Sequence, residues 1–146
     1  MSSPIPCIPR VTSIARVGLS ERLGPEEGLT VDFNFRGNDA IFGGIMGFDK
    51  PVSNKTAMER HYTISVAKIL RDFGMPKIID YLSLDIEGAE AWVLKAFPWD
   101  EFTFLVATIE RPRPELQALL KANGYKYMCD HGTFGDQMWV QITHRL

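Results

Sequence analysis

The chain has little of the chemistry that marks several classes of protein. Its two cysteines, Cys7 and Cys129, lie far apart and form no CxxC motif, so they make no disulfide framework. The net charge of −2 gives no electrostatic footprint for DNA or RNA, and no apolar run approaches the roughly 18 residues of a membrane span. The first ten residues, MSSPIPCIPR, lack the apolar core of a signal peptide. These absences favour a cytoplasmic protein in a reducing compartment.

The residues that are present indicate one globular domain. The length of 146 residues suits a single domain, and an apolar fraction of 45% is ordinary for a soluble protein. Residues 1–10 carry Pro4, Pro6 and Pro9, which fix φ and remove backbone donors, so this segment should be irregular. We therefore expect a single α/β domain over residues 11–146.

Short strand patterns occupy the first half of the chain. Thr30–Phe35 alternates apolar and polar residues, which is the period-two pattern of a half-buried strand. Shorter strands are expected at Val11–Val17 and at Ala40–Met46. The segment Lys50–Arg60 is polar and is expected to be a loop, and such loops often carry function.

Strands and helices alternate in the second half. Ser65 should cap a helix that Gly74 and Pro76 end. The elements expected after it are a strand at Ile78–Asp85, a helix at Ala89–Phe97, a strand at Thr103–Glu110, a helix from Pro114 to Asn123-Gly124, and strands at Tyr125–Cys129 and Gln137–Ile142. This alternation favours a mostly parallel sheet, with the close final pair as an antiparallel hairpin at one edge.

An acidic cluster follows the apolar strand of the motif IIDYLSLDIEGAE at residues 78–90. Asp85, Glu87 and Glu90 stand where this strand meets the next helix, and Glu110 closes the following strand. Ligands of open α/β sheets gather at the carboxyl ends of the strands. The carboxylates therefore indicate a candidate site at that edge.

Two alternatives remain open for these carboxylates. Acidic residues at a helix N-terminus also cap free N–H groups and complement the helix dipole, and Glu90 suits that supporting role. Glu110 would share a proton with Asp85 if the two strands are neighbours, or it would form an ion pair with Arg111 or Arg113.

Metal-binding patterns are weak in this sequence. Clustered carboxylates can hold Mg²⁺, but no dense D-x-D loop is present, so we expect no metal site. His131 and Cys129 lack the further ligands of a zinc site. His61, in the polar loop, could be a base or contact substrate, but it is interpreted as a surface histidine. Asp136 precedes the last expected strand, where it is either a site residue or a simple turn former.

Several motifs together resemble the FkbM family of S-adenosylmethionine-dependent methyltransferases. They are IDYLSLDIEGAE at 79–90, ATIE at 107–110, NGY at 123–125 and GDQMWV at 135–140, with weaker likeness at VTSIARVGLSE (11–21) and GGIMGF (43–48). The resemblance implies an incomplete Rossmann-like methyltransferase sheet. It also implies transfer of a methyl group from S-adenosylmethionine to a hydroxyl of a small molecule or sugar.

The resemblance assigns residues to roles. It implies catalytic roles for Asp85, Glu87 and Glu110, in that order, and cofactor contacts for Ser20 and Asp85. The family's glycine-rich cofactor turn has no counterpart before Val11, so the domain is expected to be truncated at its N-terminal side. The alternative is a non-catalytic interaction module that lost its cofactor half and self-associates through an exposed sheet edge.

Overall fold

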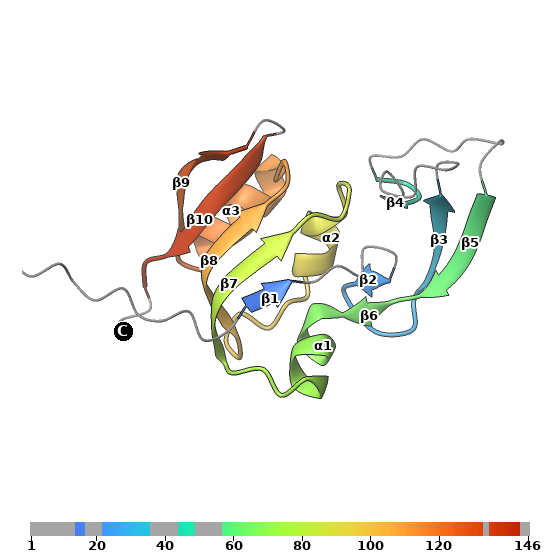
Figure 1. Ribbon diagram of the computed structural model, residues 1–146, viewed down its shortest axis with the longest axis horizontal. Helices are drawn as coiled ribbons and strands as arrows, with labels where there is room; N and C mark the ends of the chain where they lie inside the picture. Colours follow the sequence, from blue (N-terminus) through green and yellow to red (C-terminus); the bar gives the residue numbers. More distant parts are fainter. Residues whose placement is uncertain (1–13, 17–21, 36–43, 49–56, 133–134, 144–146) are drawn as a thin grey trace, which may run out of the picture.

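The computed structural model describes residues 14–16, 22–35, 44–48, 57–132 and 135–143 (Figure 1). Its largest element is a five-stranded sheet, called here the main sheet. The strands, in spatial order, are β1 (Ile14–Arg16), β7 (Ile78–Leu84), β8 (Thr103–Ile109), β10 (Asp136–Gln141) and β9 (Tyr125–His131). The segment 1–10 lies outside the described residues, as does His144.

Both parallel and antiparallel pairs occur in the main sheet. β7 lies inside the sheet and pairs in parallel with β1 and with β8, whereas β10 is antiparallel to β8 and to β9. The expected antiparallel hairpin at one edge is therefore confirmed. The described chain is a mixed α/β protein, and the Rossmann-like arrangement stays a prediction.

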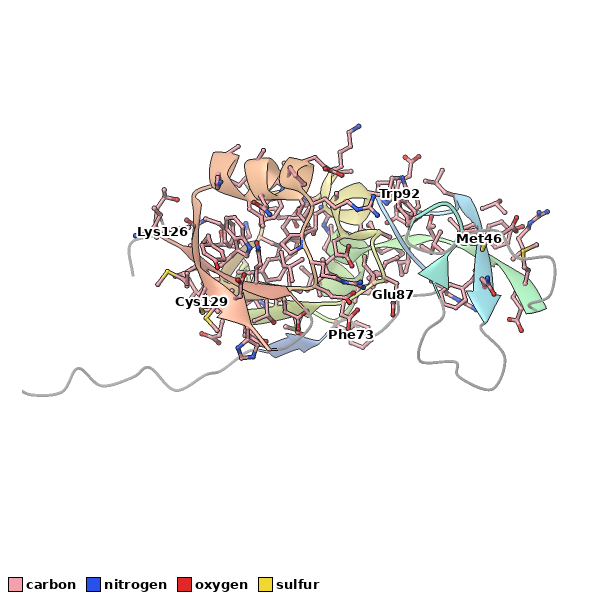
Figure 2. The ribbon with its side chains drawn as sticks, turned by 90° about the horizontal axis from the view of Figure 1, so that it is seen from above. Met46, Phe73, Glu87, Trp92, Lys126 and Cys129 are labelled. Atoms are coloured by element: carbon pink, nitrogen blue, oxygen red, sulfur yellow. The ribbon has the colours of Figure 1, made fainter. Side chains whose placement is uncertain are left out.

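Two helices cover one face of the main sheet (Figures 1 and 2). They are α2 (Glu90–Leu94) and α3 (Pro114–Ala122), and their buried side chains join those of the strands in one core. The core includes Leu82, Leu84, Ala107, Ile109, Val93, Leu94, Leu116 and Leu120. Burial of apolar surface at about 25 cal/mol per Å² is the main force that holds the helices on the sheet.

Local signals in the sequence set the helix ends. The Oγ atom of Ser65 accepts a hydrogen bond of 3.1 Å from the backbone N–H of Lys68, so Ser65 caps α1 (Val66–Asp72) as expected. Pro114 opens α3, where its missing N–H has no intrahelical partner to lose. Gly124 follows the helix at φ 81°, a conformation that glycine adopts without strain.

A second sheet projects from the body of the molecule (Figure 1). This outer sheet has the order β4 (Gly44–Ile45), β3 (Thr30–Phe35), β5 (Ala57–Tyr62) and is antiparallel. A short parallel pair, β2 (Leu23–Gly24) with β6 (Ile64–Ser65), leads from the outer sheet to α1.

The outer sheet confirms one expectation and corrects another. Thr30–Phe35 is a strand with Val31 and Phe33 buried, as its alternation predicted, although Asn34 on the other face is also buried. The loop expected at Lys50–Arg60 is wrong over residues 57–60, which belong to β5. The pattern AMERHY is too polar to signal a strand, and pairing with β3 supplies the backbone hydrogen bonds that its composition does not suggest. Residues 40–43 and 50–56 lie outside the described part.

No helix among the described residues is long and apolar enough to cross a membrane. The cytoplasmic location stays a prediction.

Candidate functional site

The carboxyl ends of β7 and β8 bring two acidic residues together. The register pairs Leu84 with Ile109, and the backbone N–H of Glu110 donates to the carbonyl of Leu84 at 3.0 Å. Asp85 and Glu110 therefore follow neighbouring strands at the same level of the sheet. The structure thus brings Asp85 and Glu110 to one place, as parallel neighbours require.

The turn from β7 to α2 is held by a buried carboxylate. Glu90 is 3% exposed, and its Oε1 atom accepts hydrogen bonds from the backbone N–H groups of Ile86, at 3.0 Å, and Gly88, at 3.2 Å. The expectation that Glu90 supports the turn is confirmed. A carboxylate that accepts two backbone N–H groups fixes the turn that carries Asp85 and Glu87.

Backbone strain gathers in the two loops at this edge. Glu87 has φ 56° and Arg111 has φ 36°, both in the left-handed region that side chains with a Cβ atom rarely adopt. Gly88, next to Glu87, has φ 93° at no such cost. Strained residues of this kind cluster at functional sites, because surrounding contacts must hold them in place.

An arginine links the carboxylates of the two loops. The Nη2 atom of Arg111 lies 2.5 Å from Oε1 of Glu110 and 3.8 Å from Oε2 of Glu87. Glu87 lies at the turn between β7 and α2 (Figure 2). The sequence left two alternatives open for Glu110, namely an ion pair with Arg111 and a position next to Asp85. In the structure both occur together. Sequence reasoning did not name Arg111 as a site residue.

Burial and a neighbouring carboxyl change the acidity of Glu110. Burial raises its pKa from the ordinary 4.5 to about 7, and hydrogen bonding and repulsion from the Asp85 carboxyl add to the rise, while Arg111 opposes it. Two ionised carboxylates cannot donate to each other, and the buried Oε2 of Glu110 then has no partner among the described residues. Above this pKa the ionised Glu110 can accept a proton, and the protonated form can donate a hydrogen bond to Asp85.

A third strand contributes polar atoms at the same edge. β10 runs antiparallel to β8, and Gln137 pairs with Ile109, so the start of β10 lies beside the end of β8. Oδ1 of Asp136 and Oε1 of Gln137 are buried without hydrogen-bond partners among the described residues. The motif GDQMWV contains both residues, and the sequence left a family position and a turn former open for Asp136 but did not single out Gln137.

The other candidates lie elsewhere. Ser20 falls outside the described residues. The prediction for His61 is wrong, because His61 lies on β5 rather than in a surface loop. Its side chain is 12% exposed, its Nε2 atom is 3.5 Å from Oε2 of Glu59, and its ring packs edge-on against Phe33. Pairing with β3 places His61 on the inward face of the outer sheet with Phe33.

The end of β9 carries Cys129 and His131, and both are exposed. Within the described ranges, no group of three or more histidine, cysteine, aspartate or glutamate side chains could hold a metal ion. The raised pKa of Glu110 beside Arg111 suits the edge of β7 and β8 to proton transfer near neutral pH.

Comparisons with known proteins agree with the motifs. Searches of curated proteins and of solved structures found no match. The family model described as Methyltransferase FkbM domain matches residues 34–127, well over half of the chain. The matched range contains Asp85, Glu87 and Glu110, and Ser20 lies outside it. The resemblance seen in the sequence is confirmed, and the chain belongs to the FkbM methyltransferase domain family.

Proposed function

We propose that this domain transfers a methyl group from S-adenosylmethionine to a hydroxyl oxygen of a small molecule or sugar. The observation that carries the proposal is Glu110, whose pKa of about 7 beside Asp85 suits a general base at neutral pH. Membership of the FkbM family supports methyl transfer in general. The proposal adds to this a hydroxyl acceptor and the roles of single residues.

The proposed reaction is a direct displacement. The acceptor oxygen forms a bond to the methyl carbon as the carbon–sulfur bond breaks, and the hydroxyl proton passes to the carboxylate of Glu110. Asp85 then hydrogen-bonds the protonated Glu110, as the contact between the two side chains favours. Arg111 holds Glu110 in position from the other side. Positioning of this kind supplies much of the rate of a two-substrate reaction.

The charge of the site suits the cofactor's cation. S-adenosylmethionine supplies the methyl group on a positively charged sulfonium, and the buried Oδ1 of Asp136, which has no hydrogen-bond partner among the described residues, complements such a charge. Asp85 would hold the cofactor, together with Ser20, four residues beyond the end of β1. Arg16, the last residue of β1, pairs with Ser83, so β1 ends at the same sheet edge as β7. The described residues include no glycine-rich turn after a strand that would hold the methionine part.

Calorimetry and radiolabelled methyl transfer test the proposal. The wild-type chain should bind S-adenosylmethionine, and a panel of sugar and small-molecule hydroxyls should reveal the acceptor. D85N should weaken binding of the cofactor about tenfold, through loss of one charge-assisted contact. E110Q should bind the cofactor normally and lose about 100-fold or more in transfer rate, the usual effect of removing a general base.

The exposed Asp32 of the outer sheet provides a matched control, since D32N also removes one carboxylate and should leave both measurements unchanged. No heat at millimolar S-adenosylmethionine would rule out a cofactor site in this chain. A transfer rate in E110Q equal to that of the wild type would show that Glu110 is not the general base. It would not contradict the cofactor site.

A further inference from the structure

A groove lies between the two helices that cover the main sheet. Its volume is about 430 Å³, within the range of roughly 300–1,000 Å³ that small-molecule sites occupy. Trp92 of α2 and Leu119 of α3 line it, as does Phe48 from the turn after β4. The ring centroids of Trp92 and Phe48 are 5.4 Å apart, and the ring planes meet at 42°, so flat apolar surface lines the groove. We call it the α2–α3 groove.

The rim of the α2–α3 groove carries more positive than negative charge. Lys95 and Arg113 line it, with Glu115 as the one acid among its lining residues. Lys95 is exposed at the end of α2 and forms no ion pair with any described residue. An anion bound there would meet a cation that no described carboxylate already neutralises.

The groove is separate from the carboxylates of the candidate site, but the same two loops reach both. In Figure 2, Trp92 lies on the side of the molecule where α2 and α3 lie, and Glu87 lies farther toward the strands. The same two loops reach both places, because Gly88 follows Glu87 and Arg113 follows Arg111 by two residues, and both Gly88 and Arg113 line the groove. The N–H of Gly88 donates to Glu90, so an occupant would touch the turn that carries Asp85.

We propose that the α2–α3 groove binds a small molecule with a flat, apolar ring system and one anionic group. The ring would lie against Trp92 and Leu119, and the anion would face Lys95. Aromatic walls give such a ligand its contact area, and a lysine ammonium gives it a charge-assisted hydrogen bond. This inference goes beyond the proposed methyl transfer and does not depend on it.

Three naphthalene probes test the charge preference on the complete wild-type chain. They share one ring system and carry a sulfonate, a neutral hydroxymethyl group or a methylammonium group. In titrations without S-adenosylmethionine, the sulfonate should bind most tightly and the ammonium most weakly. Amide shifts in NMR spectra should appear at Gly88 and Leu119 and be absent at Met128 on exposed β9. Equal binding of all three probes, or shifts spread over the whole chain, would overturn the proposal.

Two variants tie the binding to the α2–α3 groove. K95Q removes an exposed charge without a buried contact, so it should fold normally and weaken the sulfonate about fivefold while sparing the neutral probe. K121Q is the matched control, because Lys121 is exposed on α3 and does not line the groove. W92L should weaken all three probes. Unchanged sulfonate binding in K95Q would show that Lys95 does not contact the anion, whatever the result of the methyl-transfer assay.

Discussion

Two carboxylates at the edge of β7 and β8, Glu90 and Glu110, differ from Asp32 of the outer sheet, whereas Asp85 beside Glu110 is exposed. Glu90 and Glu110 are largely buried, and Glu110 lies beside a second carboxyl group. Asp32 on β3 is 40% exposed and makes an ordinary ion pair of 2.9 Å with Arg60, which lowers its pKa. The candidate site therefore contains carboxylates with restricted access to water, whereas the charge of Asp32 in the outer sheet is solvated.

Backbone geometry shows the same contrast. The residues other than glycine that have positive φ among those described, Glu87 and Arg111, both lie in the loops after β7 and β8. In the described turns next to the outer sheet, positive φ occurs at two glycines, Gly28 and Gly47. Among the described residues, positive φ at side chains with a Cβ atom is thus confined to the edge of the candidate site, and such strain is common at functional sites.

The largest expected effect comes from the buried carboxylate of the turn. E90A should lower the free energy of unfolding by about 2–3 kcal/mol, because the buried N–H groups of Ile86 and Gly88 lose their acceptor. E90Q keeps an acceptor oxygen and should cost less than half as much. Urea denaturation measures both variants, and an E90A cost below that of D32A would reverse the proposed contrast between the two regions.

Substitution of Glu110 should change the free energy of unfolding less than E90A does, and in the opposite direction. Its pKa in the folded chain is about 7, above the ordinary 4.5, so the folded state retains a proton that the unfolded state releases between these values. Stability of the wild type should fall as pH rises through that window. At pH values above it, E110Q should stabilise the fold by about 1–2 kcal/mol, discounted for partial solvation.

The pH dependence provides the control for E110Q. Below pH 4.5, both folded and unfolded states carry the proton, so the variant should then match the wild type in urea denaturation. Stabilisation that is equal at low and high pH would show that the gain does not come from the ionised Glu110. A gain in stability with a loss of methyl transfer is the trade-off expected for a catalytic group.

Relief of backbone strain should have a modest effect. E87G should raise the free energy of unfolding by about 0.5–1 kcal/mol, because glycine adopts φ 56° without the steric cost that glutamate bears there. E87N should fall between the two, since asparagine tolerates the left-handed region. Loss of stability in E87G would show that the contact with Arg111 outweighs the strain.

The smallest effect is expected in the outer sheet. D32A removes the partner of Arg60 from an exposed pair and should change the free energy of unfolding by about 0–0.5 kcal/mol. High salt should remove even this difference, since exposed pairs are screened. A cost above 1 kcal/mol in chemical denaturation would mean that the outer sheet depends on its charges as strongly as the site does.

Much of the main sheet was predictable because its signals are local. The apolar run before Asp85, the cap at Ser65 and the start of a helix at Pro114 each depend on neighbours a few residues away. β5 was missed because its stability comes from pairing with β3, about 30 residues earlier in the chain. His61 was misplaced for the same reason. The sequence predicted that Asp85 and Glu110 meet if their strands are neighbours, and it offered the ion pair of Glu110 with Arg111 as an alternative. It did not predict the contact of Arg111 with Glu87 or the burial of Gln137 at the same edge.

By itself, the sequence determined that acidic residues end two strands and that a helix follows each of them, since periodicity and end signals are written in adjacent residues. Only the tertiary structure decided that the two strands are neighbours, that Glu110 is buried beside Asp85, and that Arg111 reaches both Glu110 and Glu87. Desolvation and charge repulsion act through space, so the acidity of Glu110 depends on groups that its own segment of sequence does not contain.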